Sequence, residues 1–268
     1  MKSSKKFMGL RVLLFCLALL LPLTAVAITY GQPDGAGHPN VGALVAEWRV
    51  VGLKEILCSG TLISPTVFLT AAHCTAYLQV RRITNVWVTF DSEFTATSNL
   101  IPGIMHTNPG YNWAQSDPGD IAVITFDEPV IGITPAVLPT TGLFDRLQAE
   151  GTLQGQKFTS VGYGVLEPYV GGGPQWFPDT NLRWVAVSEF RALNKAWLRL
   201  SQNNATGDGG TCYGDSGGPN FLGAGGNETS ILAGLTVKGD AMCRATNVIY
   251  RLDTQTVREF LKDFVFLP

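Results

Sequence analysis

Residues 212–219 read Cys212-Tyr213-Gly214-Asp215-Ser216-Gly217-Gly218-Pro219, a single serine held between glycines. Glycine has no Cβ and accepts positive φ, so such a run turns sharply and can point adjacent NH groups at one spot. A serine hydroxyl that attacks a carbonyl needs such donors for the charge that develops on the oxygen. The stretch therefore predicts Ser216 as a nucleophile and the NH groups of Gly214 and Ser216 as an oxyanion hole. The alternative is a glycine-rich surface turn.

A nucleophilic serine needs a base, and the chain has three histidines. His38 and His106 lie in stretches without an obvious partner, which favours ordinary loop or surface roles. His73 follows an expected strand at 67–70 and lies within Thr70-Ala71-Ala72-His73-Cys74. The small residues allow close packing and the cysteine can tether the segment. We expect His73 to be the base.

The base in turn needs a buried carboxylate to hold its second ring nitrogen. Asp120 opens the apolar run Ile121-Ala122-Val123-Ile124, which places it at the edge of a barrel interior. Asp117 precedes a proline and Asp127 follows the strand, so we expect both to be solvated turn residues.

Together these stretches resemble the trypsin/chymotrypsin family of serine proteases. Three of its signatures occur in the family's chain order, namely Thr70-Ala71-Ala72-His73-Cys74, Asp120-Ile121-Ala122-Val123 and Gly214-Asp215-Ser216-Gly217-Gly218-Pro219. Ser59-Gly60-Thr61 and Gly162-Tyr163-Gly164 are also similar to family landmarks. The resemblance implies an all-β fold of two antiparallel six-stranded barrels, with His73 and Asp120 on the first barrel and Ser216 on the second.

The distribution of β-branched and aromatic residues also indicates an all-β chain. Short apolar runs recur between Gly, Pro and Asn, and one segment, 253–266, has helical spacing with Asp253 or Thr254 as its N-cap. The expected strands are 42–51, 60–63, 67–70, 86–90, 121–126, 156–161, 182–187, 231–237 and 248–252. We place a first barrel at about 28–140, a second at 141–252 and a terminal helix at 253–268. A connector is expected within 132–155 and a surface loop at 168–178.

The first 27 residues read as a secretory signal peptide. Four cations, Lys2, Lys5, Lys6 and Arg11, precede an apolar stretch at 12–23, and Ala25-Val26-Ala27 is a cleavage signature. The alternative is a membrane anchor, but the apolar stretch has about 12 residues where a bilayer needs about 20. We expect a secreted protein, extracellular or periplasmic, without an anchor once the signal is removed, and a monomer.

Charge argues against a nucleic-acid partner. Removing the four signal-peptide cations from the 19 basic residues leaves 15 against 21 acidic residues, a net charge of −6. The longest basic run that remains is Arg81-Arg82, too short to neutralise a phosphate backbone. The family resemblance implies polypeptide substrates, protein protease inhibitors as further partners, no cofactor and no metal.

Four cysteines remain after the signal peptide, Cys58, Cys74, Cys212 and Cys243. An even number in an exported chain indicates two disulfides, and the residues alone leave all three connectivities open. The resemblance implies Cys58 with Cys74 and Cys212 with Cys243.

The resemblance also implies a mode of activation, in which a new N-terminal ammonium pairs with the acid that precedes the catalytic serine. That acid is Asp215, and the corresponding new N-terminus is Ile28-Thr29-Tyr30-Gly31, directly after Ala27. No Lys or Arg stands just before Ile28, so we hypothesise that signal peptidase itself creates the activating end. The alternative is that Ile28 begins a disordered end.

Substrate preference is the least determined feature. The resemblance implies Gly210, six residues before Ser216, at the base of the primary pocket, where an Asp would be needed for cleavage after Lys or Arg. Bulky walls favour small or medium apolar side chains, and the alternative is that Lys238 or Arg244 favours an acidic one. The expected pocket residues are Gly210, Thr211, Thr236, Val237, Lys238 and Val248.

These observations predict a serine endopeptidase in which Ser216 forms an acyl-enzyme, His73 acts as base and then acid, and Asp120 orients His73. A catalytically silent binding protein on the same fold is an alternative. A lipase or esterase fits less well: the glycines around Ser216 match its motif, but its residues follow the order Ser, Asp, His, and no histidine follows Ser216.

Overall fold

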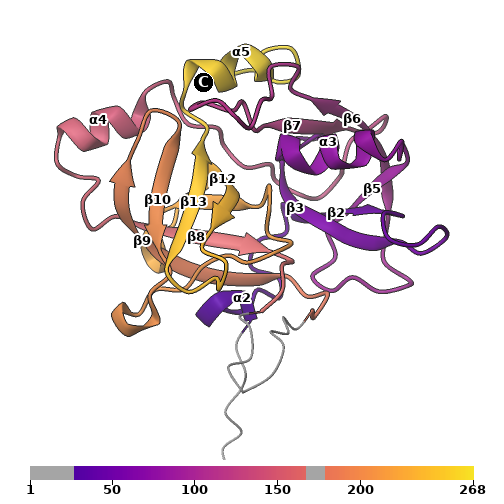
Figure 1. The fold of residues 1–268 in the computed structure, drawn as a ribbon, viewed down its shortest axis with the longest axis horizontal. Coiled ribbons are helices and arrows are strands. Elements are labelled where there is room, and N and C mark those ends of the chain that lie inside the picture. Colours follow the sequence, from indigo (N-terminus) through magenta and orange to yellow (C-terminus); the bar gives the residue numbers. More distant parts are fainter. Residues whose placement is uncertain (1–26, 167–178) are drawn as a thin grey trace, which may run out of the picture.

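A computed structural model describes residues 27–166 and 179–268, and two β-barrels lie side by side in it (Figure 1). The predicted signal peptide, up to residue 26, and the predicted loop 168–178 lie outside the described residues. No helix in the two described ranges has the length and apolar character needed to cross a bilayer.

The first barrel is closed by six antiparallel strands in the order β2-β3-β4-β7-β6-β5. They are β2 (Val41–Ala46), β3 (Glu55–Ser64), β4 (Val67–Thr70), β5 (Val86–Thr89), β6 (Ile101–Thr107) and β7 (Ala122–Thr125). The sequence did not predict β6, because Pro102 and Gly103 both weaken a strand. Gly103 is needed there, since a Cβ at this position would lie 2.3 Å from a methyl group of Ile124 on β7.

The second barrel closes because β8 pairs with both β9 and β11. Its strands are β8 (Lys157–Gly162), β9 (Trp184–Leu193), β10 (Trp197–Ser201), β11 (Pro219–Leu222), β12 (Leu232–Gly239) and β13 (Thr246–Arg251), with β1 (Gln32–Pro33) added at the edge of β9. Neighbouring strands are antiparallel, so the predicted pair of antiparallel six-stranded barrels is confirmed.

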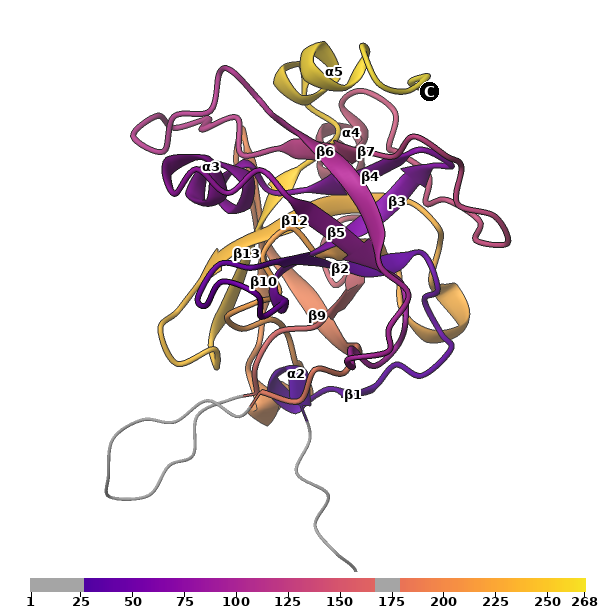
Figure 2. The same ribbon diagram turned by 90° about the vertical axis from the view of Figure 1, so that its right-hand side faces the viewer.

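The helices are short and lie outside the barrels. They are α2 (Ala27–Tyr30), α3 (Ala72–Val80), α4 (Leu143–Ala149) and α5 (Gln255–Leu261), with 3-10 turns η1 (Asn204–Thr206) and η2 (Gly225–Asn227). Figure 2 shows α5 at the end of the molecule opposite α2. The terminal helix is shorter than predicted. Thr254 caps its start, and the amides of Phe264 and Val265 both donate to the Leu261 carbonyl, which closes it.

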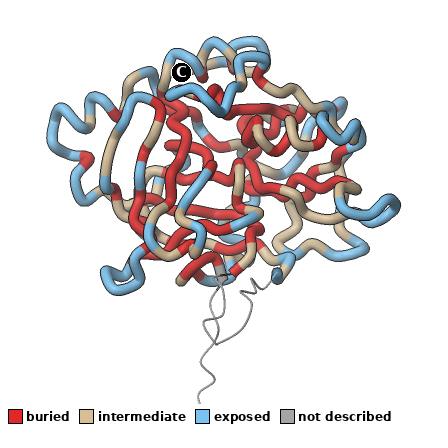
Figure 3. The backbone as a smooth tube through the Cα atoms, viewed as in Figure 1, coloured by how far each residue is buried: buried red, intermediate tan, exposed pale blue. Residues whose placement is uncertain are grey.

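Buried residues lie within each barrel and also between the two barrels (Figure 3). One cluster combines Val41 and Leu69 of the first barrel with Val161 and Leu235 of the second. Burial of apolar surface between the two barrels fixes their relative position. Residues at facing ends of strands from the two barrels are thereby brought close together.

Candidate active site

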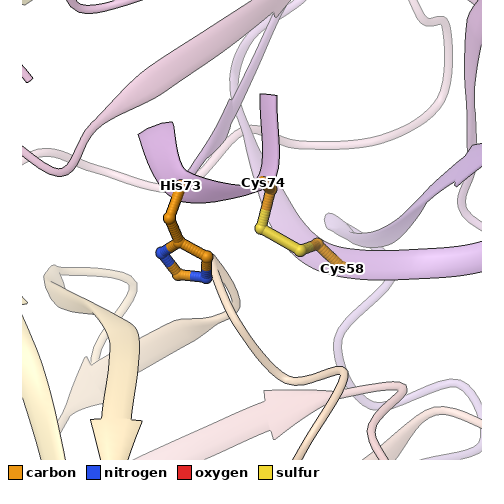
Figure 4. Close-up of side chains that lie close together, drawn as sticks. All are labelled: Cys58, His73 and Cys74. Carbon is orange, nitrogen blue, oxygen red and sulfur yellow. A yellow bond between two sulfur atoms is a disulfide. The ribbon is translucent and has the colours of Figure 1, made fainter. Parts of the chain in front are cut away.

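His73 lies in the first turn of α3, just where β4 ends. Ala71 and Ala72, between the strand and the histidine, are fully buried, so the backbone can approach the second barrel closely. The Cys58–Cys74 disulfide ties this turn to β3, and Figure 4 shows His73 beside it. Both sulfur atoms are used in the disulfide, so the Cys58, His73 and Cys74 group offers no thiolate to a metal.

Asp120 lies immediately before β7 and is fully buried. One carboxylate oxygen, Oδ1, accepts the backbone NH of His73 at 2.9 Å, and Oδ2 lies 2.9 Å from His73 Nδ1. A carboxylate only accepts, so Nδ1 carries the hydrogen and Nε2 is left with a lone pair. The two bonds fix both the backbone and the ring of His73, which is the arrangement a general base requires.

Ser216 lies on the loop before β11 and is half-buried. Its carbonyl accepts the NH of Ser59 on β3 at 2.9 Å, and the Ser59 hydroxyl donates to the Gly214 carbonyl at 3.0 Å. A Cβ on Gly217 would lie 2.2 Å from Thr70 Oγ1 and 2.7 Å from the Ala71 nitrogen. The serine loop therefore packs directly against the segment that carries His73.

The backbone NH groups of this loop divide into two kinds. Those of Asp215 and Gly217 donate to the carbonyls of Cys212 and Thr236. Those of Gly214 and Ser216 donate to no other group in the described part of the chain. Gly214 has φ 96°, a left-handed conformation that glycine adopts readily. The free NH groups of Gly214 and Ser216, which are separated by one residue, are suited to bind an oxyanion.

Asp215 points away from this spot into the protein and is fully buried. Its oxygens accept the backbone NH groups of Gly164 and Cys212, each at 2.8 Å. Burial nevertheless raises the pKa of Asp215 to about 7. No ion pair reaches this carboxylate in the ranges the structure describes.

Ile28 is buried against Trp184 and Leu166 at the foot of the second barrel. The next residue, Thr29, accepts the NH of Gly210 at 2.9 Å. Ile28 is preceded by Ala27 in this chain, so its nitrogen is a peptide nitrogen, not an ammonium. The segment predicted as the activating end thus lies beside the 209–210 backbone.

The second disulfide, Cys212–Cys243, forms part of a pocket of about 220 Å³ that Ser216 also lines. Both pairings are those implied by the resemblance. Thr211, Thr236, Val237 and Lys238 line this pocket, with Gly239, Asp240, Tyr213 and Trp113. Gly210 and Val248, which we expected at the base and wall, do not line it. The Gln202 side chain packs directly against Gly210, because its Oε1 would lie 2.1 Å from a Cβ at Gly210.

Some residues have roles that the sequence did not predict. His38, expected in an ordinary loop without a partner, bonds to Asp34 and to Glu228, the latter at 2.8 Å, and stacks on Phe221. Burial lowers the pKa of His38, but the two carboxylates outweigh burial and raise it to about 9. The partner Glu228 is far away in sequence, so no local pattern reveals the pair. Trp113 also escaped prediction, although its ring lies edge-on 6.3 Å from that of His73.

Comparisons with known proteins found similar sequences. A family model described as Trypsin matches residues 37–257, a range that contains His73, Asp120 and Ser216. Kallikrein 1-related peptidase b24 of Mus musculus is 26% identical to this chain over 223 residues, which cover 75% of this chain and 77% of that protein.

Proposed function

The chain belongs to the trypsin family of serine proteases, and we propose that it is a secreted serine endopeptidase that hydrolyses peptide bonds through an acyl-enzyme. The observation that carries the proposal is the buried Asp120 carboxylate, which holds His73 by two hydrogen bonds. A buried charge is costly unless it is satisfied, and in the described part of the chain both hydrogen bonds of Asp120 go to His73, which favours catalysis over a silent binding role.

In the proposed reaction the Ser216 hydroxyl attacks the substrate carbonyl while His73 Nε2 takes its proton. The carbonyl carbon becomes tetrahedral and its oxygen gains the negative charge, which the free NH groups of Gly214 and Ser216 receive. His73 then gives the proton to the leaving amine, and the C–N bond breaks to leave an ester on Ser216. Water then attacks the ester carbonyl in the same way, with His73 as the base, and the carboxylic acid product leaves Ser216 free. Asp120 keeps the imidazole in the required tautomer and stabilises its charged form.

Activation is proposed to follow from cleavage after Ala27. The new Ile28 ammonium would pair with Asp215, whose buried carboxylate otherwise has no cation among the residues that the structure describes. The ion pair would order residues 214–216 and hence the oxyanion hole. N-terminal sequencing of the secreted, active protein tests this: we expect Ile28 first, and full activity with another first residue would contradict direct activation by signal peptidase.

Secretion and substrate preference are parts of the same proposal. The N-terminal signal pattern and the two disulfides support an oxidising compartment outside the cytoplasm. The pocket beside Ser216 is small, and the one carboxylate in its described lining, Asp240, already accepts backbone NH groups of its own turn, which supports little cleavage after Lys or Arg. We expect a monomer that acts on polypeptides and is open to protein protease inhibitors.

Hydrolysis of an unstructured protein such as casein tests the activity. Wild-type protein should release peptides, and Ser216→Ala should lower the rate at least about 10³-fold, since the hydroxyl is the attacking group. Ser230→Ala, which removes an exposed hydroxyl outside the site, is the matched control and should keep the wild-type rate. If wild-type protein that begins at Ile28 does not hydrolyse casein, the result favours a silent binding protein.

A further inference from the structure

We propose that Lys238 and Trp113 form a subsite that selects an acidic side chain in the substrate residues preceding the scissile bond. The inference rests on the proposed function in one respect only, that Ser216 marks where the peptide lies. It specifies the substrate class of that site as peptides with a carboxylate at one of the positions before the cleaved bond.

The cation of Lys238 lies at the junction of the two barrels. Lys238 is exposed near the end of β12, and its Nζ lies 4.2 Å from the centre of the Trp197 ring and 5.4 Å from that of Trp113. Trp113 comes from the loop between β6 and β7 of the first barrel. Trp113, Lys238 and Ser216 line the same pocket. A peptide at Ser216 therefore lies beside a cation flanked by two aromatic rings.

This arrangement is held in place before any ligand arrives. Trp197 Nε1 donates to the Ser116 carbonyl at 3.1 Å, and the Tyr250 hydroxyl donates to Asp117 at 2.6 Å. Both bonds join the loop that carries Trp113 to the second barrel. Contacts of the ammonium with the aromatic faces restrict the lysine side chain as well. A pre-positioned group loses little freedom when a ligand binds, so more of its interaction appears as affinity.

The ammonium of Lys238 has no carboxylate partner within residues 27–166 and 179–268. The acid in the pocket wall, Asp240, is engaged by its own turn, because its oxygens accept the backbone NH groups of Arg244, Ala245 and Thr246 at 2.8 to 3.1 Å. Burial raises the pKa of Asp240, but these bonds outweigh burial and hold it below its usual value. The three donors of the lysine head are thus available to a ligand.

A carboxylate is the group that fits this site best. It accepts from the ammonium, and its methylene groups can pack on the exposed Trp113 ring. A fully solvated ion pair changes an equilibrium constant less than about 5-fold. The aromatic walls exclude water on two sides of the ammonium, so we expect a preference of about 5- to 10-fold for Glu over Gln at low salt.

Binding to a Ser216→Ala protein tests the subsite without requiring hydrolysis. The probes are fluorescein-labelled octapeptides that share a central Ala-Ala bond and carry Glu or Gln at one of the four positions before it. At one position or more the Glu peptide should bind about 5- to 10-fold more tightly at about 20 mM NaCl, and less than 2-fold more tightly at about 500 mM, because salt screens exposed charges. Lys238→Met should remove the preference. Lys238→Glu should reverse it, so that a peptide with Lys at the same position binds more tightly than the Gln peptide.

Lys54→Met is the matched control, because Lys54 Nζ also lies 4.2 Å from a tryptophan ring, that of Trp87, but lines no part of this pocket. It should keep the Glu preference. Equal binding of Glu and Gln peptides at all four positions, or a preference that survives Lys238→Met, overturns the inference. Casein hydrolysis by wild type separates the two proposals. Hydrolysis of casein without a Glu preference in binding refutes only the proposed subsite. A Glu preference without hydrolysis refutes only the proposed protease activity.

Discussion

The proposed ion pair between Ile28 and Asp215 makes a quantitative prediction about a single added residue. A protein that begins at Ile28 should have a different pH dependence of stability from one that begins at Ala27. In the longer form the nitrogen of Ile28 is an amide, so Asp215 stays buried without a cation. Burial then raises the pKa of Asp215 from 3.8 to about 7.

The sign and size follow from this pKa. An acid whose pKa is higher in the folded state stabilises folding fully below its unfolded pKa and loses that contribution as pH rises through the folded value. At about 1.4 kcal/mol for each tenfold change, the change from 3.8 to about 7 amounts to about 4 kcal/mol. The form that begins at Ala27 should lose that stability between about pH 4 and pH 7. The form that begins at Ile28 should not, because its ammonium compensates the carboxylate.

Urea denaturation of both forms at pH values from 4 to 8 measures the difference directly, since the two proteins share every titrating side chain and differ only in the position of the terminal ammonium. Asp215→Asn in both backgrounds is the control, and it should make the two pH profiles parallel, because the asparagine side chain does not titrate. Parallel profiles of the two proteins with Asp215 intact would refute the proposed pairing.

Other perturbations test the packing and charges around the site. Gly217→Ala adds a Cβ 2.2 Å from Thr70 Oγ1 at a φ of 77°, so we expect the serine loop to shift and casein hydrolysis to fall about 100-fold with unchanged circular dichroism; a normal rate would contradict the tight packing. Gln202→Met removes two buried polar atoms that have no partner among the described residues, and it should raise the free energy of unfolding by about 1 to 3 kcal/mol in urea; destabilisation would show that the amide is satisfied. His38 has a pKa raised to about 9, so its contribution of up to about 3 kcal/mol should be complete below pH 6.5 and lost as pH rises through 9. His38→Gln should flatten urea midpoints over that range, and an unchanged slope would contradict the assignment.

The sequence predicted the fold because its strands and family signatures are local patterns. Alternating and β-branched runs such as 67–70 and 86–90 lie close to the strands observed. The residues of the predicted site are also marked locally: small residues precede His73, an apolar run follows Asp120, and glycines surround Ser216. Each pattern has a physical requirement behind it, either close packing or a turn.

Features that depend on long-range contacts could not be predicted. His38 meets Glu228 only after the N-terminal segment packs on the second barrel, and Trp113 meets Lys238 only across the junction of the barrels. Which residue forms the base of the substrate pocket depends on such contacts too. Gln202 fills the space beside Gly210, and nothing in the sequence near Gly210 indicates which side chain does so.

The central claim is that Ser216 is a nucleophile activated by His73. Treatment with a fluorophosphonate, followed by mass spectrometry of the peptides, tests it most directly. We predict one adduct per chain, on Ser216, which forms far more slowly when His73 is replaced by Ala although the serine remains. An unlabelled Ser216 in protein that begins at Ile28, or labelling at the same rate without His73, would contradict the claim.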